Sequence, residues 1–594
     1  CTCRRVLHDS KEIIGIGLKL VRIRFSIGKG ELPDLSADRL NIYLLHLLNS
    51  EASRASLPFP RKQTGWSNDG FPILSRLSRK NRWELAQTLA SMKRALPPSC
   101  RQHSTSQWST WSQRACTPTP PSSDPAYLKF VRKIVRRSFR IGWDTHLYPS
   151  FSHSFVPQLS SRRDRSVAGH WWASESNKKE FLGAVLGGGK VDALRGLPLE
   201  LRYKEVPSVG KVRPLGLPTH HYDLLGPLHK SIYEWISKKE WVLKGPPTVK
   251  RLNNVLVNKV HTSVDLVSAT DNLPLDVTEA MLGALLSKSR VVPGSIKVLA
   301  HESLRPEVFG HGGSHSVTHG QMMGTYLSFP LLCLHSYCAA RWASRNDDSA
   351  KIIVNGDDTL ISSARRLDDY PSGYIMNKTK TMISKNAAEI NSTTFLQQNG
   401  RWKQVRNPRH LGATSSFTGI THLASACLAA GPAWVSAFIR CRIGRSWKFL
   451  PSQLGFSWTN HACWKREKQM MRAYTPLPKA PVPASRYVVL LEEPSLCEKL
   501  AFQYDLFNNA REGSPMKRGP WNPSWWKVVK TYPKPKKMSA TELRYRQLHG
   551  FPSFNPRLVD KTVEKRVWVG KEDWGFTPQE DSELALWSYL VGDQ

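Results

Sequence analysis

Hydrophobic and polar residues form blocks along the middle of the chain, and four of these blocks predict defined elements. The short stretch 261–266 carries β-branched residues and predicts a strand that ends at Asp265. The stretches 274–286 and 328–343 carry apolar residues at helical intervals, each with a proline near its start, and predict two helices. The stretch 351–362 is apolar on both sides of a polar centre, which predicts a β-hairpin.

Outside these blocks the pattern divides the chain into segments. The stretch 97–125 is rich in Ser, Thr, Pro and Gln and predicts a linker or mobile loop. Strand-like and helix-like stretches alternate from about 126 to 400, and helix-compatible stretches follow to about 505. Near the start, a small helical segment is predicted by apolar residues at helical spacing: Leu40, Tyr43, Leu44, Leu47 and Leu48.

The charge balance points to a polyanionic partner. Lys and Arg number 85 against 47 acidic residues, a formal net charge of +38. Nucleic acid is the commonest partner of so basic a chain, and an anionic membrane surface or a generally basic proteome is the alternative. No apolar run approaches the roughly 20 residues that span a bilayer, so we expect no transmembrane segment.

The ten cysteines form no CxxC pair. This argues against a zinc ribbon and a disulfide framework, and it fits a reducing compartment. The basic opening stretch is interrupted by Asp9 and Glu12, which makes it a weak match to a mitochondrial transit peptide.

Three aspartates lie at the ends of the predicted strands. Asp265 ends one strand, and Asp357 and Asp358 follow Gly356 in the turn of the hairpin, whose apolar flanks indicate a buried hairpin. Hard divalent cations prefer oxygen ligands, and nucleotidyl transfer uses two such ions a few ångströms apart. The arrangement therefore predicts a two-metal centre. Asp271 either contributes to the start of the following helix or contacts a ribose hydroxyl, and spacing leaves both roles open.

Segments around these aspartates resemble the motifs of a known polymerase family. The stretch 263–271, in which Asp271 follows Asp265 at an interval of six positions, resembles motif A of the narnavirus, ourmia-like virus and levivirus group. The stretch 320–332 is similar to motif B of ourmia-like viruses (botourmiaviruses), and Gly356-Asp357-Asp358 takes the place of motif C. The stretch 377–392 resembles motif D and its continuation, and 205–214 resembles motif F. Five motifs in the correct order make the resemblance specific.

This resemblance to viral RNA-dependent RNA polymerases implies an α+β, right-hand fold with an antiparallel-sheet palm. It implies Mg²⁺ or Mn²⁺ held by Asp265 and Asp357, with Asp358 supporting. The domains expected from it are listed in chain order: an N-terminal helical extension and linker (1–125), fingers with motif F (126–260), a palm with motifs A to D and an interleaved fingers segment (261–400), a thumb (401–505) and a basic extension rich in Trp and Pro (506–594).

The resemblance also implies roles for residues around the metals. Lys211 and Arg213 would bind the triphosphate, and Lys380 would donate a proton to pyrophosphate, with Lys378 as its competitor. For the remaining motif B positions, Gly324 would be a pivot and Ser328 would join the ribose-sensing network, a role compatible with capping the helix at 328. Many such polymerases carry Asn where this chain has Leu332, so sugar recognition would rest on Asp271, Ser328 or another group.

The basic extension interleaves cations with aromatic residues. Trp521, Trp525, Lys527 and Lys530 would bind RNA if bases stack on the rings and lysines neutralise phosphates. The alternative is a flap anchored on the thumb by its tryptophans.

We therefore expect an RNA-directed RNA polymerase that replicates a positive-sense single-stranded viral RNA genome. Its partners would be template RNA, nascent RNA and nucleoside triphosphates, in the host cytoplasm. A non-catalytic RNA-binding protein derived from a polymerase is the alternative, and a reverse transcriptase is a further one. A mitovirus, in mitochondria, is the competitor within the family, because the chain has 21 tryptophans and mitochondria read a stop codon as Trp.

Overall fold

The computed structural model divides the chain into two compact units. One unit comprises residues 1–148 and 194–444, and the other comprises 149–193 and 445–594. The structure describes residues 1–28, 53–54, 77–98, 100, 102, 106–117, 122–157, 163, 171, 174–188, 199–208, 211–367, 370–377, 380–443, 450–457, 459–472, 490–492, 526–531 and 563–568. The helix predicted around 40–48, Lys378, Trp521 and Trp525 lie outside these residues.

A five-stranded antiparallel sheet lies at the centre of the first unit. Its strands, in spatial order, are β1 (Ser53–Arg54), β9 (Met382–Ser384), β4 (Val260–Val264), β8 (Asp358–Ser363) and β7 (Lys351–Asn355). Asn355 pairs with Asp358, so β7 and β8 are joined by the two-residue turn Gly356-Asp357. The predicted strand and hairpin are confirmed.

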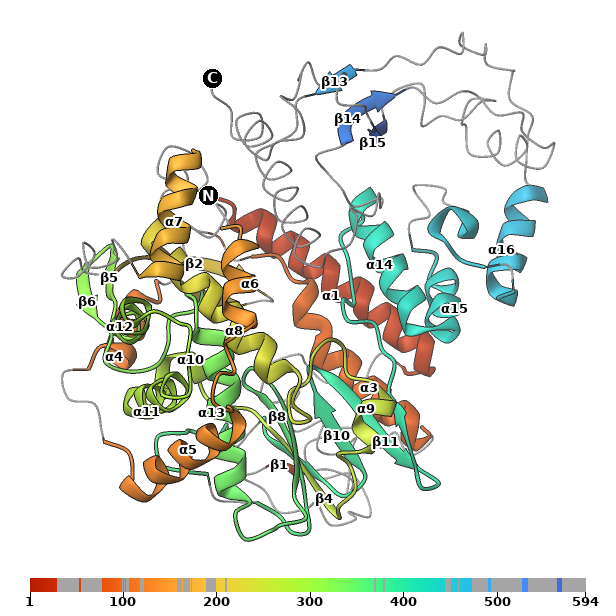
Figure 1. Ribbon diagram of the computed structural model, residues 1–594. Helices are drawn as coiled ribbons and strands as arrows, with labels where there is room; N and C mark the ends of the chain where they lie inside the picture. Colours follow the sequence, from red (N-terminus) through yellow and green to blue (C-terminus); the bar gives the residue numbers. More distant parts are fainter. Residues whose placement is uncertain are drawn as a thin grey trace. The chain divides into compact units, whose positions relative to one another are not determined.

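Helices cover one face of this sheet (Figure 1). The helix α13 (Ser328–Ala343) contacts β7 and β8, and α11 (Leu275–Leu286) and α5 (Pro125–Ser138) pack against it. Both helices predicted from the apolar pattern are confirmed. Ser328 is not the cap of α13, because Leu327 occupies that position in the left-handed conformation and the Ser328 hydroxyl donates to the Thr325 carbonyl at 2.8 Å.

A second antiparallel sheet covers the opposite face. It comprises β10 (Ala387–Ile390), β11 (Thr393–Gln398) and β12 (Arg401–Gln404). Ile353 and Leu360, paired across β7 and β8, are buried against Phe395 and Trp402 of this sheet. Burying each side chain of this size stabilises the folded state by about 1.5–3 kcal/mol, so packing against the second sheet holds the β7–β8 hairpin in place.

A third sheet pairs strands from two distant regions. Its spatial order is β3 (Lys211–Pro218), β2 (Glu200–Ser208), β5 (Glu307–Gly310) and β6 (Gly313–Ser316). The β2 and β3 strands form an antiparallel hairpin, and β2 pairs with β5 in parallel.

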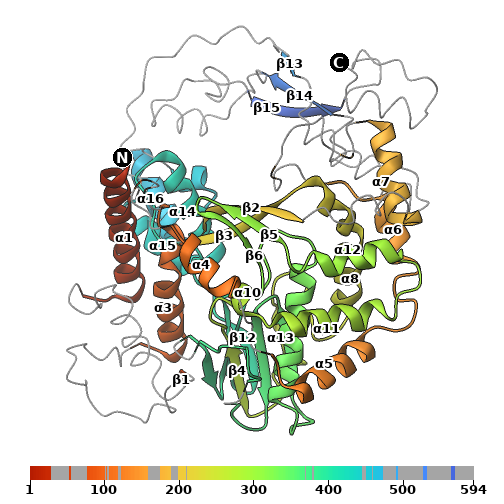
Figure 2. The same cartoon turned by 90° about the vertical axis from the view of Figure 1, so that its left-hand side faces the viewer.

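The stretch 97–125, predicted to be a linker or mobile loop, contains the helix α4 (Trp108–Ala115). Trp108 and Trp111 are buried, and the Trp108 ring lies 4.9 Å from that of Tyr203 and 5.3 Å from that of His315. Figure 2 shows α4 beside β6 and α10 (Ala269–Asn272). The linker prediction was wrong here, because two buried tryptophans outweigh a polar composition.

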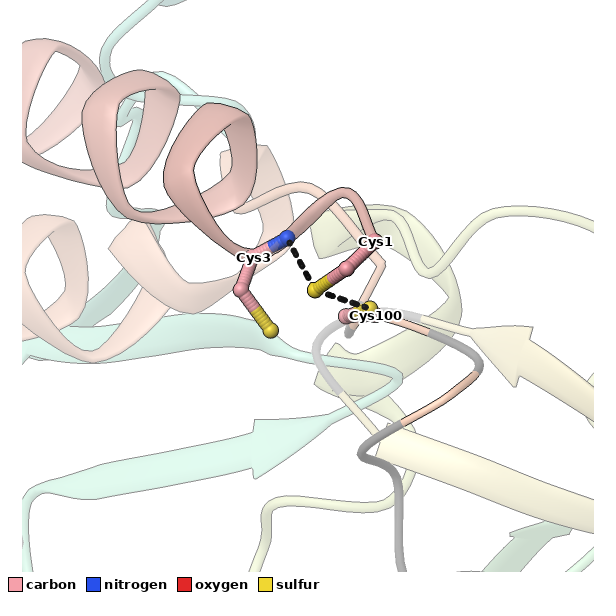
Figure 3. Close-up of side chains that lie close together, drawn as sticks. All are labelled: Cys1, Cys3 and Cys100. Carbon is pink, nitrogen blue, oxygen red and sulfur yellow. Dashed lines mark hydrogen bonds between the residues drawn. The ribbon is translucent and has the colours of Figure 1, made fainter.

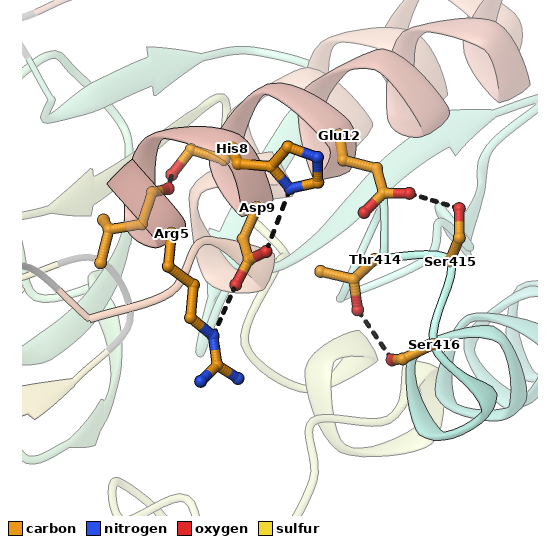
Figure 4. A network of polar contacts seen from close by, with 9 residues as sticks. Arg5, His8, Asp9, Glu12, Thr414, Ser415 and Ser416 are labelled. Carbon is orange, nitrogen blue, oxygen red and sulfur yellow. Dashed lines mark hydrogen bonds and ion pairs between the residues drawn. The ribbon is translucent and has the colours of Figure 1, made fainter. Parts of the chain in front are cut away.

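The first helix, α1 (Cys3–Phe25), packs against elements from the early and the late parts of this unit's sequence. It contacts α3 (Arg79–Ser91), the 3-10 helix η2 (Met92–Ala95) and α15 (Pro432–Arg440). Glu84 accepts two hydrogen bonds from Arg24, both at 3.1 Å, and one from Trp434 Nε1 at 2.7 Å. Figure 4 shows a polar network on the same helix, in which Ser415 donates to Glu12.

The remaining elements complete the two units. In the first they are η5 (His220–Leu225), α8 (Gly226–Ser237), α9 (Val249–Asn253), α12 (Gly294–Glu302) and α14 (Phe417–Ala430). In the second they are α7 (Glu175–Gly187), η7 (Pro451–Leu454), α16 (His461–Arg472) and the antiparallel sheet β13 (Leu490–Glu492), β14 (Trp526–Thr531) and β15 (Val563–Trp568). The helix α6 (Leu147–His153) crosses the boundary. Within the described ranges, no helix is both long and apolar enough to span a bilayer.

Candidate active site

Three aspartates lie at one edge of the central sheet, and Glu389 of β10 in the neighbouring sheet is near enough for its charge to act on them. Asp265 directly follows β4, Asp357 lies exposed in the β7–β8 turn, and Asp358 begins β8, the neighbour of β4. Burial, together with the charges of Asp357, Glu389 and Asp265, raises the pKa of Asp358 to about 7. A carboxyl that resists ionisation in this way marks a region of excess negative charge, which a cation would relieve.

The residues present suit a divalent cation. The Asp265 Oδ2 atom is buried and accepts no hydrogen bond from the described residues, and the Lys380 ammonium lies 3.5 Å from it. The carboxylate oxygens of Asp265, Asp357 and Asp358 do not all lie within 4.8 Å of one another. Binding one ion would therefore draw the carboxylates together, and the exposed Asp357 is the one with room to turn.

The turn that carries Asp357 is fixed on α13. The Gly356 amide donates to Cys333 Sγ at 3.3 Å, and its carbonyl accepts from Ser336 Oγ at 2.7 Å. Gly356 has φ +64°, and a Cβ there would lie 3.2 Å from the Phe329 ring. Cys333 and Ser336 were not predicted as site residues, although two small polar residues three positions apart in an apolar helix could have indicated them.

The loop between β6 and α13 is held on two sides. The Gly320 amide donates to the Leu273 carbonyl at 2.8 Å, and the Gln321 amide donates to Thr270. Gly324 has φ +98°, and a Cβ there would lie 2.8 Å from the carbonyl oxygen of Gly216 in β3. Both glycines are thus required by close approaches of the backbone.

Asp271 lies in α10 beside a cation from a distant segment. Arg114 Nη1, from α4, lies 3.9 Å from Asp271 Oδ2 and donates to Ser268 Oγ at 3.1 Å. Burial raises the pKa of Asp271, and Arg114 opposes this by lowering it. Arg114 was missed from the sequence because its helix lies in the stretch predicted to be a linker.

Cations surround the carboxylates. The Lys380 amide is held by the Asn377 side chain at 3.1 Å, and the Asn377 amide donates to the Asp265 carbonyl at 2.7 Å. Arg94 of η2 donates to Ser392 Oγ at 2.5 Å. Burial lowers the pKa of Arg94, and the charges of Glu389 and Asp358 partly offset that shift. The short 3-10 helix therefore brings a cation to the site from outside every predicted motif.

Burial also lowers the pKa of Lys93, the residue before Arg94, and the charge of Lys380 lowers it further. The carboxylates of Asp265 and Glu389 oppose this shift, so Lys93 lies within reach of the same cluster. Glu389 itself accepts from Gln87 of α3 at 3.2 Å. No sequence motif indicated Gln87, Lys93 or Arg94, since only the tertiary fold brings them here.

The predicted triphosphate-binding and RNA-binding cations lie on strands β3 and β14. Arg213 is exposed on β3, opposite Val206. Lys211 begins the same strand, opposite Ser208, and its side chain lies outside the described part of the structure. Lys527 and Lys530 lie on β14, and their side chains are likewise not described.

A buried set of hydrogen bonds also holds α13, through His335. His335 is fully buried, with Nε2 2.8 Å from Thr278 Oγ1 and Nδ1 2.6 Å from the Tyr374 hydroxyl. Burial lowers the pKa of His335 to about 3, from an ordinary value of 6.5. The ring is therefore neutral at physiological pH, and one nitrogen accepts a hydrogen bond while the other donates.

We expect this histidine to make the protein sensitive to acid. Its folded-state pKa lies below its unfolded value, so its contribution to stability is full above about pH 6.5 and is lost progressively toward pH 3. His335→Gln should lower stability at pH 7.5 by about 1–3 kcal/mol but flatten the fall below pH 6.5. Unfolding midpoints measured between pH 5 and 8 test this. His422→Gln, at an exposed position on α14, should leave both the midpoint and the slope unchanged. An unchanged acid slope in His335→Gln would contradict the assignment.

Comparison with known proteins gives one finding for this region. Residues 224–404 match the family model described as Mitovirus RNA-dependent RNA polymerase. The matched stretch contains Asp265, Asp271, the 356–358 turn, Lys380 and Glu389. Arg94, Arg114, Lys211 and Arg213 precede it. Comparison with curated proteins finds no match.

Proposed function

We propose that this chain, which its match over residues 224–404 identifies as an RNA-dependent RNA polymerase of the mitovirus and narnavirus type, replicates a positive-sense single-stranded viral RNA genome by two-metal nucleotidyl transfer. The proposal is carried by the carboxylate cluster of Asp265, Asp357 and Asp358 inside the matched region. Polymerases of this family are nucleotidyltransferases, and the net charge of +38 suits an RNA template and product.

The proposed fold is a right hand. In it the central sheet with α11 and α13 is the palm, the sheet of β2, β3, β5 and β6 belongs to the fingers, and α14 and α15 belong to the thumb. The mixed fold with antiparallel sheets is compatible with this assignment. The activity would lie in the host cytoplasm or in mitochondria, and stop codons at tryptophan positions of the gene would indicate the latter.

In the proposed mechanism, Asp265 and Asp357 would hold the metal ions and Asp358 would support them. When bound, Mg²⁺ or Mn²⁺ lowers the pKa of the attacking 3′ hydroxyl and neutralises charge on the leaving pyrophosphate. Asp358, whose pKa is near 7, is the carboxyl whose charge state responds most to a nearby cation. The turn presents Asp357 without rearrangement of its backbone, because Cys333 and Ser336 hold both polar groups of Gly356.

Cations of the chain would bind and protonate the phosphates. Lys380 is held beside Asp265, where it can protonate the leaving pyrophosphate as the bond breaks. Lys211 and Arg213 would bind the triphosphate from β3, and Arg94 and Lys93 would add charge from η2. Lys380 as proton donor and Lys211 with Arg213 as triphosphate ligands rest on the resemblance, and the 3.5 Å ion pair supports the first.

Recognition of the sugar would rest on Asp271 and the loop before α13. Asp271 would accept from the ribose hydroxyl, with Arg114 keeping its carboxylate charged. Ser328, whose hydroxyl is directed to the Thr325 carbonyl, would join this network, and Gly324 would allow the loop to pivot. Leu332 is apolar, so its side chain supplies no hydrogen bond at the position where many RNA polymerases have Asn.

A template-copying assay tests the function. The purified full chain, given a single-stranded RNA template, four ribonucleotides and Mg²⁺, should make complementary RNA. Synthesis from deoxynucleotides at an equal rate would indicate a reverse transcriptase. RNA binding without any synthesis, in either Mg²⁺ or Mn²⁺, would indicate a non-catalytic RNA-binding protein.

Arg114 should act on nucleotide use through Asp271. Without the guanidinium the pKa of Asp271 rises, since Arg114 is the charge that lowers it. Arg114→Ala should raise the KM for ribonucleotides about fivefold, because a part-exposed ion pair contributes at most about 1 kcal/mol. The acid limb of the kcat/KM profile should also shift to higher pH. Arg114→Lys should restore much of both, and a loss of kcat alone would contradict this role.

A further inference from the structure

Three cysteine thiols meet beside the start of α1, away from the carboxylate cluster. Cys1 and Cys3 come from the beginning of the chain, and Cys100 comes from the segment after η2 (Figure 3). The three sulfur atoms all lie within 4.8 Å of one another. The Cys1 and Cys100 sulfurs are 3.8 Å apart, and the Cys3 amide donates to Cys1 Sγ at 3.4 Å. Cys100 is buried, so the group lies partly inside the protein.

The sulfur spacing is that of a metal site. A zinc–thiolate bond is about 2.3 Å long, and two ligands at tetrahedral angles around one zinc ion are then about 3.8 Å apart. The Cys1 and Cys100 sulfurs already have this separation. A disulfide would require about 2.05 Å, so it would require these sulfurs to move much closer together.

We propose that Cys1, Cys3 and Cys100 bind one Zn²⁺ ion as thiolates, with water in the fourth position. Binding converts three thiols to thiolates and releases three protons to solvent, with no change of oxidation state. Thiolate ligands select zinc over Mg²⁺, which prefers oxygen, so this site is chemically distinct from the carboxylate cluster.

The site would tie α1 to the segment that follows η2. That 3-10 helix carries Lys93 and Arg94, and it contacts α1 directly. A bridge from Cys1 and Cys3 to Cys100 therefore closes a loop of about 100 residues, where a covalent or metal link removes most entropy from the unfolded chain. Such an ion would hold the start of α1 to this segment, and the proposed site lies outside the region that matches the polymerase family.

A second group on α1 carries no such proposal. His8, Asp9 and Glu12 also bring their ligand atoms within 4.8 Å of one another. Their polar atoms already have partners, since Arg5 lies 3.7 Å from Asp9 and Ser415 donates to Glu12 (Figure 4). These contacts within the protein account for the positions of the Asp9 and Glu12 carboxylates, so no metal ion is needed to explain them.

Metal content of the full chain tests the proposal. The protein is expressed with added zinc, purified without chelator under reducing conditions, and measured for zinc by atomic emission. We expect about one zinc ion per chain. Cys3→Ser and Cys100→Ser should each lower this by at least fivefold, and Cys116→Ser, at a half-buried cysteine outside the group, should leave it unchanged.

Two measurements on the unaltered chain keep the test decisive if a variant fails to fold. A thiol-specific mercurial should release the zinc to a chromogenic chelator, and Co²⁺ in place of zinc should give the intense thiolate-to-cobalt absorption of a sulfur site. A chain with less than a tenth of an equivalent of zinc and no such cobalt absorption would overturn the proposal. A Cys1–Cys100 disulfide, found by mass spectrometry of protein from a reducing lysate, would also overturn it.

Discussion

Asp357→Asn should reduce RNA synthesis by roughly 10³-fold or more and leave the fold intact. The amide has the size of the carboxylate but no charge, so it is a poor ligand for a hard divalent cation. Losing a metal ligand costs several kcal/mol of transition-state stabilisation, and each 1.4 kcal/mol is a factor of ten in rate. The fold is spared because Asp357 is exposed at the tip of the turn, which Cys333 and Ser336 hold through Gly356.

A matched control separates this effect from a general loss of negative charge. Asp348→Asn makes the same chemical change at an exposed aspartate outside the cluster and should leave synthesis within twofold of the unaltered chain. Initial rates of nucleotide incorporation are measured across a Mn²⁺ titration, with unfolding midpoints recorded for both variants. Undiminished synthesis in Asp357→Asn would remove the aspartate from the proposed metal site, whereas a lowered midpoint would assign the loss to misfolding.

The sequence was most informative where local pattern and chemistry coincide. Apolar runs on both sides of Gly356-Asp357 predict the hairpin, and the β-branched residues before Asp265 predict β4. Since β4 and β8 are neighbours, these two elements bring the aspartates to one edge of the sheet. The helix α13 was equally predictable from its apolar spacing, although its first residue was assigned the wrong capping role.

Residues that reach the site from distant segments could not be predicted. Arg114 and Arg94 lie more than 150 residues before Asp271 and Asp358, and only tertiary packing brings them close. Trp108 and Trp111 are the buried aromatic residues of a helix of only eight residues. So short an apolar pattern could not be recognised within the Ser- and Pro-rich stretch 97–125. In such stretches two aromatic anchors are sufficient to fix a helix, because each buries a large apolar area.

Gly320→Ala should destabilise the first unit by about 2–5 kcal/mol and abolish most activity. Gly320 has φ +71°, where an L side chain costs about 1–2 kcal/mol. A Cβ at this position would lie 2.2 Å from the Thr270 carbonyl oxygen and 2.7 Å from the Asp271 carbonyl carbon. Backbone cannot rotate away as a flexible side chain can, so overpacking adds about 1–3 kcal/mol and displaces α10.

Gly400→Ala isolates the steric part of this effect. Gly400 has nearly the same φ, +73°, and a Cβ there would meet none of the described atoms within 4 Å. It should therefore lower the unfolding midpoint by the backbone strain alone and leave kcat/KM unchanged. Denaturant unfolding and ribonucleotide kinetics of both variants make the comparison. If the two variants lose equal stability and both keep their activity, the contact between Gly320 and α10 does not position Asp271. If only Gly320→Ala loses activity, the close approach of Gly320 to α10 helps to position Asp271, because the backbone strain is nearly the same in both variants.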